Sequence, residues 1–223
     1  MLLKIDLHVH TIYSGDSSIT LNDLLTQVRK SSLDGVAVTD HDTILGAERV
    51  SRILKIYGWN DELIVIPGIE VSTRGGHILG LNVSKPIPKG LSAKEAIERI
   101  HEAGGIAVAA HPQTVFKDGV GLGPKLLSMG LDAIEVINSS LFPFKPLTYV
   151  CKKFAEHYGL PQTAGSDSHI PETIGLAYTL IESEDKSVDK ITEAISRGLT
   201  EPLGKGLPLS LRVKRVLKRQ GKN

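Results

Sequence analysis

The chain has 223 residues, of which 41% are hydrophobic and 23% are charged, a composition that excludes a disordered or fibrous protein. A chain of this length is long enough for one α/β domain with a large buried core. The formal net charge is only +1, so no global electric field would draw the molecule onto nucleic acid or a membrane surface. Any polyanion must therefore be bound locally.

The chain contains a single cysteine, Cys151, which excludes an internal disulfide and fits a reducing compartment. We interpret it as a small apolar core residue rather than a nucleophile or a metal ligand. The first residues run directly into a polar, His-rich stretch without the apolar segment of a signal peptide. No apolar run approaches the length of a transmembrane helix. We therefore expect a cytoplasmic protein without a membrane span.

Short runs rich in Val, Ile and Leu alternate with segments of helical period, which is typical of βα units and a mostly buried parallel sheet. The expected strands are residues 3–6, 35–39, 63–72, 77–83, 106–110, 133–137, 162–164 and 177–181. The expected helices are residues 20–31, 43–57, 92–104, 146–158 and 187–197. Thr20 is the expected cap of the first helix, Thr43 or Asp42 that of the second, and Ser92 forms a capping box with Glu95 in the third.

The strongest chemical signal is the run Asp-Leu-His-Val-His-Thr at residues 6–11, directly after the first expected strand. Residues i and i+2 of an extended segment point to the same side, so His8 and His10 can face one ion. A neutral imidazole is a common ligand of zinc, manganese and iron. A single His-x-His pair is nevertheless weak evidence for a metal site.

Four further polar segments strengthen this interpretation, and each follows an expected strand: residues 39–43, 68–72, 109–112 and 165–169. Six of the eight histidines lie at or near strand ends, namely His8, His10, His41, His77, His111 and His169. Barrels and open α/β sheets place their sites at the carboxyl ends of their strands, so we expect these side chains to converge.

A cluster of metal ions also needs anionic oxygen, which offsets the charge of the ions and bridges them, and Glu70 is the expected bridging ligand. The alternative is that these residues are ordinary polar groups of the core or surface. Burying so many ionisable groups together without ions would cost about 1–3 kcal/mol for each unmet group. We therefore favour the metal site.

In these motifs the chain resembles the PHP family, named for polymerase and histidinol phosphatase domains. The resemblance rests on residues 6–16, 39–42, 68–70, 110–112 and 165–169. It implies an α/β fold, a distorted seven-stranded (β/α) barrel with a trinuclear metal site at the carboxyl ends of the strands. Two or three divalent ions, manganese, zinc or iron, are the implied cofactors.

The resemblance also implies the ligands of each ion. One ion would be held by His8, His10, Glu70 and Asp167, a second by Glu70, His111 and His77, and a third by Asp16, His41 and His169. We expect Asp40 or Asp42 to accept the second ring N–H of a ligating histidine, although Asp42 is equally suited to begin a helix. His41, His169 and the acidic neighbour Asp40 are the candidates for proton transfer to the leaving group.

Such a cluster supplies a metal-activated water and holds a phosphate oxygen. The expected reaction is hydrolysis of a phosphate ester of a nucleotide or another small phosphorylated metabolite. The alternatives are a nuclease or exonuclease acting on oligonucleotides, and a non-catalytic, metal-stabilised nucleic-acid-binding module. We expect Ser14, Ser166 and Ser168 to shape loops or donate to phosphate, since no histidine remains free to activate them. Lys117 is interpreted as a solvated loop residue rather than a phosphate contact.

We divide the chain into a PHP-type phosphoesterase domain at residues 1–206 and a basic C-terminal tail at residues 207–223. Six residues between Leu211 and Lys222 are Lys or Arg. Four apolar residues of the tail fall on one helical face: Leu209, Val213, Val216 and Leu217. We expect a helix that docks this apolar stripe on the barrel. Contact with nucleic acid, ahead of contact with an anionic membrane, is the alternative.

Overall fold

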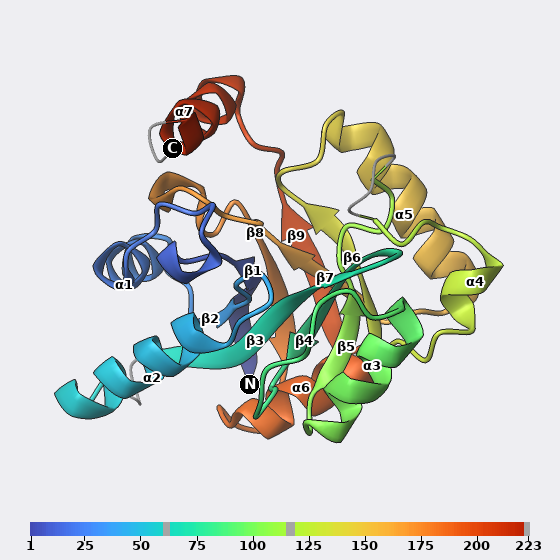
Figure 1. Cartoon of the computed structure of the whole chain (residues 1–223), viewed down its shortest axis with the longest axis horizontal. Helices are drawn as coiled ribbons and strands as arrows, with labels where there is room; N and C mark the ends of the chain where they lie inside the picture. Colours follow the sequence, from blue (N-terminus) through green and yellow to red (C-terminus); the bar gives the residue numbers. More distant parts are fainter. Residues whose placement is uncertain (60–62, 115–118, 221–223) are drawn as a thin grey trace.

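The computed structural model describes residues 1–59, 63–114 and 119–220, without the side chains of residues 219 and 220. These residues form one mixed sheet that curves into a nearly closed barrel, with helices packed around its outer face (Figure 1). The expected α/β barrel is therefore confirmed. Lys117 lies outside the described residues.

The described sheet has nine strands in the order β7-β6-β5-β4-β3-β2-β1-β8-β9, whereas the family resemblance implies seven. Their bounds are β1 Leu2–Val9, β2 Gly35–Val38, β3 Ile64–Thr73, β4 Gly76–Leu81, β5 Ile106–Ala109, β6 Ala133–Asn138, β7 Gln162–Gly165, β8 Ala177–Glu182 and β9 Thr200–Gly204. All eight expected strands are confirmed. The sequence does not predict β9, because Thr-Glu-Pro-Leu-Gly lacks an apolar run and Pro202 is tolerated only where a strand needs no ladder hydrogen bond from that residue.

The expectation of a parallel sheet is wrong. Pairs β1–β2, β2–β3, β5–β6 and β6–β7 are parallel, whereas β3–β4, β4–β5, β1–β8 and β8–β9 are antiparallel. The reason lies in the connection between β3 and β4, where only Arg74 and Gly75 separate the strands and no crossover helix can fit. Strand β4 therefore begins, rather than ends, at the edge where β3 ends, and it carries His77 to that edge.

Strands β1 and β7 meet at one end of the barrel. The Asp167 N–H donates to the carbonyl of His8 at 2.8 Å, and the His10 N–H donates to the carbonyl of Ser168 at 3.0 Å. Farther along, the hydroxyl of Thr179 on β8 accepts from the N–H of Ala164 on β7 at 2.8 Å and donates to the Ala164 carbonyl at 3.0 Å. These contacts close the barrel and align the ends of β1 and β7 side by side.

The helices are α1 Leu21–Lys30, α2 Leu45–Tyr57, α3 Ala93–Glu102, α4 Pro124–Leu127, α5 Phe144–Tyr158, α6 Val188–Ser196 and α7 Leu209–Gln220, with 3-10 turns η1 Ile12–Ser14 and η2 Pro171–Thr173. The capping box at Ser92 is confirmed, and Thr20 forms one with Asp23. Helix α2 has Ile44 at its N-cap and so lacks the expected side-chain cap; the Thr43 hydroxyl accepts from the Leu45 N–H at 3.2 Å, and Asp42 accepts from the Ser72 N–H on β3 at 2.8 Å. No helix in the described ranges has the length and apolar character needed to cross a membrane.

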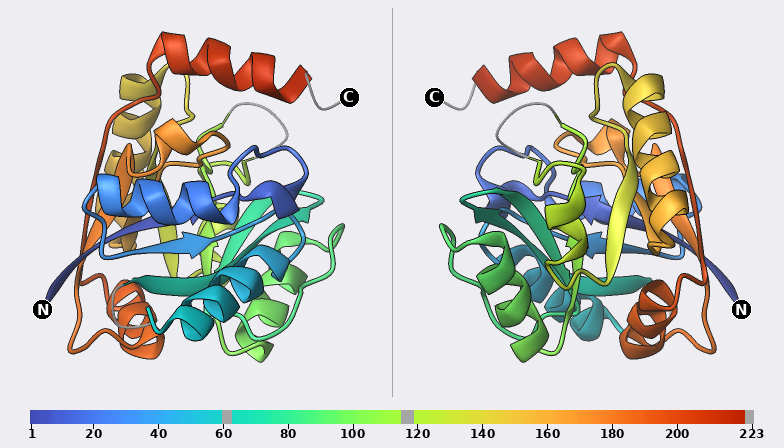
Figure 2. Two further views of the ribbon diagram at one scale, coloured as in Figure 1. Left: turned by 90° about the vertical axis from the view of Figure 1, so that its left-hand side faces the viewer. Right: turned by 90° about the vertical axis from the view of Figure 1, so that its right-hand side faces the viewer.

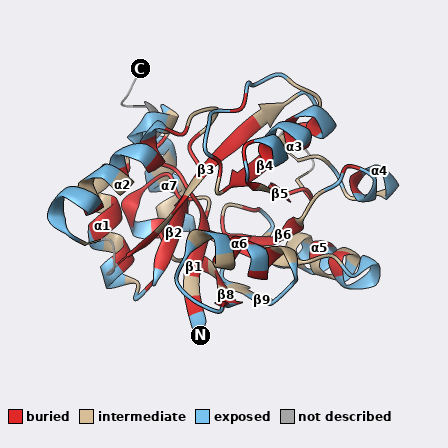
Figure 3. Cartoon of the chain, turned by 90° about the horizontal axis from the view of Figure 1, so that it is seen from below, coloured by how far each residue is buried: buried red, intermediate tan, exposed pale blue. Residues whose placement is uncertain are grey.

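One of the four apolar clusters among the described residues lies where α6 packs on the barrel strands. Ile191 and Ile195 of α6 are fully buried and belong to the same cluster as Leu7 and Leu79 of the barrel strands. Seen from below, α6 lies across this end, over strands that are mostly buried (Figure 3). Because apolar side chains fill this end, polar side chains are concentrated at the opposite one.

The expected docking of the α7 apolar stripe is wrong. The four residues of the stripe are more than half exposed: Leu209, Val213, Val216 and Leu217. The basic side of α7 faces the barrel instead, and Arg212 donates to the carbonyls of Ser140 at 3.0 Å and Leu141 at 3.2 Å. Helix α7 lies across the end of the molecule opposite α6 (Figure 2). The loop beneath it presents backbone oxygens, which a guanidinium can satisfy and an apolar side chain cannot.

The buried environment of Cys151 on α5 predicts an unreactive thiol. Its side chain is fully buried, with Sγ 3.8 Å from the carbonyl of Glu135, and burial raises the pKa of the thiol. We expect an aromatic disulfide reagent to modify the native protein on the order of 100-fold more slowly than the unfolded chain, since both thiolate fraction and access are low. The release of the coloured thiol, followed with and without denaturant, measures this ratio. Equal rates would contradict the assigned core position.

Candidate metal centre

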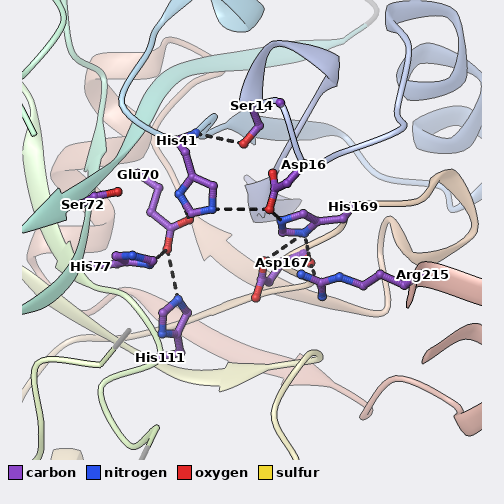
Figure 4. Close-up of a pocket in the computed structure, with 11 residues that line it drawn as sticks. Ser14, Asp16, His41, Glu70, Ser72, His77, His111, Asp167, His169 and Arg215 are labelled. Atoms are coloured by element: carbon purple, nitrogen blue, oxygen red, sulfur yellow. Dashed lines mark hydrogen bonds and ion pairs between the residues drawn. The ribbon is translucent and has the colours of Figure 1, made fainter. Parts of the chain in front are cut away.

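Polar side chains from several strand ends surround a pocket of about 450 Å³ at the end of the barrel covered by α7 (Figure 4). The described residues that line it are Ser14, Gly15, Asp16, His41, Glu70, Ser72, His77, His111, Asp167, His169 and Arg215. His8 and His10 lie deeper and are fully buried. The structure thus brings together all nine residues that the resemblance marks as ligands.

Glu70 on β3 is the centre of this arrangement and is only 1% exposed. Five imidazole nitrogens lie within 3.3 Å of its carboxylate oxygens, those of His8, His10 and His41 near Oε2 and those of His77 and His111 near Oε1. Burial by itself would raise the pKa of Glu70, but the charge of His8 and the hydrogen bonds of the other imidazoles hold this pKa well below its usual range. Glu70 is therefore an anion with both oxygens directed at possible ligands of a shared ion.

His8, on β1, and His10, just after it, face the same point, as their i, i+2 spacing in an extended segment predicts. Their Nε2 atoms are 3.0 Å apart. Burial lowers the pKa of His10 to about 3, helped by the positive charge of His169, so His10 is neutral. Burial also acts to lower the pKa of His8, but the negative charges of Glu135 and Glu70 raise it well above its usual value. This buried point therefore attracts positive charge.

The orientation of these two rings fits a divalent ion. His8 Nδ1 lies 3.0 Å from a Glu135 oxygen, and His10 Nδ1 lies 3.0 Å from the Ser14 hydroxyl. With Nδ1 of each ring directed at this partner, both Nε2 atoms face one another, and in the absence of an ion the His8 Nε2 proton lies between them. A divalent ion that displaces this proton could bind both Nε2 lone pairs. In addition, Asp16 Oδ1 and His111 Nδ1 are buried without a hydrogen-bond partner among the described residues.

Four groups of ligand atoms have all members within 4.8 Å of one another. The groups are His10, Asp16, His41 and His169; His8, Glu70 and His111; His8, His10 and Asp167; and His41, Glu70 and His77. Together the groups include every implied ligand. They differ from the implied assignment in two ways: His10 also lies in the group of Asp16, and His41 also lies in a group with Glu70. Asp16 is bound most closely by His169, at 3.0 Å. Several residues are thus shared between groups, as in a cluster of ions a few Å apart.

Glu135 on β6 is a supporting residue that the sequence analysis missed. It is 1% exposed, and in addition to its contact with His8 it accepts from the backbone N–H of His111 at 2.9 Å and from the Asn138 amide at 2.9 Å. One carboxylate thus orients two candidate ligands. The available signal was a lone charged residue inside the apolar run Ala-Ile-Glu-Val-Ile-Asn. Gly165 makes room for this pair, because an added Cβ would lie 2.3 Å from His8 Cβ and 2.8 Å from Glu135 Oε1.

We expected Asp40 or Asp42 to accept a ring N–H from a candidate histidine ligand, and neither does so. Asp42 accepts from the Ser72 N–H on β3, and Asp40 accepts from Thr11. The Asp40 carboxylate takes the Thr11 N–H at 2.5 Å and the Thr11 hydroxyl at 2.7 Å. Asp40 is fully buried and does not line the pocket, and burial raises its pKa to about 6. An added Cβ at Gly46 of α2 would lie 1.9 Å from Asp40 Oδ2, so α2 packs directly on this pair. Asp40 therefore has the geometry of a support for the segment after His10.

Asp6 supports the other side of the site, and the sequence analysis assigned it no role. Its buried carboxylate accepts from the N–H groups of Ser166 at 2.9 Å, Gly175 at 2.9 Å and His8 at 3.3 Å. Burial raises the pKa of Asp6 to about 6. These bonds fasten β1 to the segments that follow β7, which carry Asp167 and His169.

The serines occupy different places. Ser14 lines the pocket and accepts from the His41 N–H at 3.1 Å in addition to its contact with His10. Ser166 and Ser168 are buried and hydrogen-bond to one another, outside the pocket lining. Ser166 and Ser168 thus occupy loop-shaping positions.

Comparison with known sequences points to the family suggested by the motifs. The family model described as PHP-associated matches residues 151–200. An uncharacterized protein of Methanocaldococcus jannaschii is 37% identical over 147 residues, which cover 61% of this chain and 82% of the relative. A 5′-3′ exoribonuclease of Haemophilus influenzae is 36% identical over 93 residues, covering 40% of this chain and 32% of the relative. A phosphoribosyl 1,2-cyclic phosphate 1,2-diphosphodiesterase of Eggerthella lenta is 36% identical over 89 residues, covering 37% and 32%.

Two solved structures share the fold. A two-domain Bacteroides vulgatus protein containing a PHP-like metal-dependent phosphoesterase superposes with a TM-score of 0.77 at 17% identity, covering 98% of this chain and 70% of that chain. A lesion-specific endonuclease from Pyrococcus furiosus superposes with a TM-score of 0.67 at 20% identity, covering 93% and 60%. At these identities the likeness concerns the fold, and it agrees with the motifs and with the PHP-associated family model. This chain belongs to the PHP family.

Proposed function

We propose that this protein is a metal-dependent phosphoesterase that hydrolyses a phosphate ester of a nucleotide or another small phosphorylated metabolite. The observation that carries the proposal is the convergence of six imidazoles and three carboxylates around one polar pocket, with Glu70 at its centre. The names of the PHP-like structural neighbour and of the Eggerthella relative support it. We also propose a cytoplasmic location, because the chain uses a lone buried cysteine and no disulfide.

The proposed cofactor is two or three divalent ions, manganese, zinc or iron, held by nine ligands: His8, His10, Asp16, His41, Glu70, His77, His111, Asp167 and His169. When bound, such ions lower the pKa of a water molecule and polarise a phosphate oxygen. The protein's part is to hold the ligands rigidly. Glu135 orients His8 and His111, while Asp40 and Asp6 fix the segments on either side, so little reorganisation is needed during the reaction.

His41 and His169 are the proposed proton donors to the leaving oxygen, a role that each can fill only through a ring nitrogen that does not bind an ion. Both line the pocket, and the His41 side chain is 26% exposed whereas that of His169 is 5% exposed. The more accessible ring of His41 has the better approach to a leaving group. Asp40, the third candidate from the sequence, lies behind the pocket wall and is better placed to hold Thr11.

A nuclease activity on oligonucleotides is the second candidate. It is supported by the name of the Haemophilus relative and by that of the Pyrococcus neighbour, and the chain spans about a third of the former. Helix α7 lies across the pocket end of the barrel (Figure 2), which favours a small ester or the end of a single strand over a duplex. A non-catalytic module is disfavoured, because a module that had lost its chemistry would be expected to lack one or more ligands.

Removal of metal is the first test of the proposal. We expect the purified protein to contain two or three transition-metal ions per chain, measured by elemental analysis. Dialysis against a chelator should abolish hydrolysis of an aryl phosphate, and added manganese or zinc should restore it, because the ions supply the activated water. Full activity in protein shown to be metal-free would refute the proposal.

The central position of Glu70 gives a second test. Glu70→Gln removes the charge shared by five imidazoles, so metal content should fall and activity should drop by more than the ~10- to 100-fold typical of changes outside the ligand set. Glu48→Gln on the exposed side of α2 is the matched control and should behave as the wild-type protein. An unchanged metal content in Glu70→Gln would remove Glu70 from the proposed centre.

The roles of His41 and Asp40 are separated by the leaving group. His41→Asn should slow both esters through the lost ligand, and it should slow the alkyl phosphate more than the nitrophenyl phosphate, because only the poor leaving group requires a proton. Asp40→Asn should slow both esters equally and lower the free energy of unfolding by about 1–3 kcal/mol, through the weakened bonds to Thr11. Selective loss on the alkyl ester in Asp40→Asn would instead assign the proton transfer to Asp40.

A further inference from the structure

Arg215 of α7 brings a positive charge into a pocket otherwise lined by imidazoles, carboxylates and small residues (Figure 4). It is the one lysine or arginine among the described residues of the lining. Its Nη1 donates to the Ser140 hydroxyl at 2.6 Å and to the Asp167 carbonyl at 3.5 Å. Both acceptors are neutral oxygen atoms, and the nearest anion is the Asp167 carboxylate, whose pKa the Arg215 charge helps to hold below its usual range.

The contacts that hold α7 on the barrel direct Arg215 into the pocket. Arg212 binds the carbonyls of Ser140 and Leu141 one turn earlier, and Lys214 forms an ion pair with Glu172 at 2.6 Å. An amphipathic helix ordinarily buries its apolar face, whereas α7 exposes it and turns Arg212 and Arg215 toward the barrel. The helix is thus held by the polar contacts that place its guanidinium groups at the pocket end of the barrel.

The geometry of the guanidinium suits a phosphate. Arginine has five N–H donors in a planar fork that matches the oxygens of phosphate, and the contacts to Ser140 and Asp167 use Nη1 alone. The remaining donors are available to an anion in the pocket. Asp167 and His169, two of the proposed ligands, line the same pocket, so an anion held there could meet both the ions and Arg215.

We propose that Arg215 binds a non-bridging phosphate oxygen of the substrate, and that α7 is therefore a wall of the substrate site. This inference rests on the proposed phosphoester hydrolysis and names a substrate-binding residue for it. It also assigns the inward cations of the basic tail to the pocket of the same chain rather than to a separate nucleic-acid partner. Residues 207–223 then complete the site that residues 1–206 build.

The test is the binding of inorganic phosphate to the manganese-loaded full chain, measured by titration calorimetry. Arg215→Gln should weaken phosphate binding by about 10- to 100-fold, the loss expected for a charge-assisted hydrogen bond, with manganese content unchanged. The phosphate affinity of Arg215→Lys should lie between those of wild type and Arg215→Gln, because lysine keeps the charge and loses the planar set of N–H donors. Lys214→Gln is the matched control on the same helix, and it should stay within about threefold of wild type because its ion pair with Glu172 is exposed.

A second measurement separates phosphate binding from the docking of α7. Adding ethylguanidinium to Arg215→Ala should restore phosphate binding if the guanidinium acts locally, whereas a displaced helix would not be rescued. The inference is overturned if wild type binds no phosphate, if Arg215→Gln binds it as wild type does, if Lys214→Gln loses as much, or if rescue fails. Arg215-dependent binding without turnover of any phosphate ester would refute the proposed function and leave the anion site standing.

Discussion

The structure depends on the burial of one carboxylate among five imidazoles. Glu70 is 1% exposed, and a buried charge of this kind costs several kcal/mol unless it is compensated. Its partners come from the ends of β1, β2 and β5 and from the start of β4, so charge compensation draws these four segments to one point. The same requirement explains why divalent cations suit the site, since they offset several acids while accepting imidazole lone pairs.

The polar centre and the apolar cluster under α6 lie at opposite ends of the barrel. At one end α6 inserts Ile191 and Ile195 among the strands, and at the other the strands end in acids and histidines. Three further carboxylates, Asp6, Asp40 and Glu135, are buried near the site, and their partners are mostly backbone N–H groups or hydroxyls. These acids lie behind the pocket and hold its walls in place. Proposed ligands on different loops are thereby fixed before any ion or substrate binds, which reduces the ordering cost of binding.

The C-terminal helix α7 is also held at the pocket end by polar contacts. Its basic face satisfies backbone oxygens at Ser140 and Leu141, and its apolar stripe remains exposed. Compensation of charge and hydrogen-bonding groups at the pocket end thus outweighs the burial of a few apolar side chains. The barrel strands and α7 thus both place charged and polar groups at the same pocket, where these groups compensate one another.

The sequence by itself determined the features that depend on neighbouring residues. Period-2 spacing placed His8 and His10 on one side of a strand, capping boxes at Ser92 and Thr20 began two helices, and the ordered motifs identified the family and the nine residues that converge. Only the tertiary structure decided that β4 runs antiparallel, that β9 joins the sheet, that Glu135 supports His8 from 127 residues away, and that α7 turns its cations inward. Local spacing and capping act over a few residues, whereas the partner of a strand edge or a buried charge depends on which distant segments the closed barrel brings into contact.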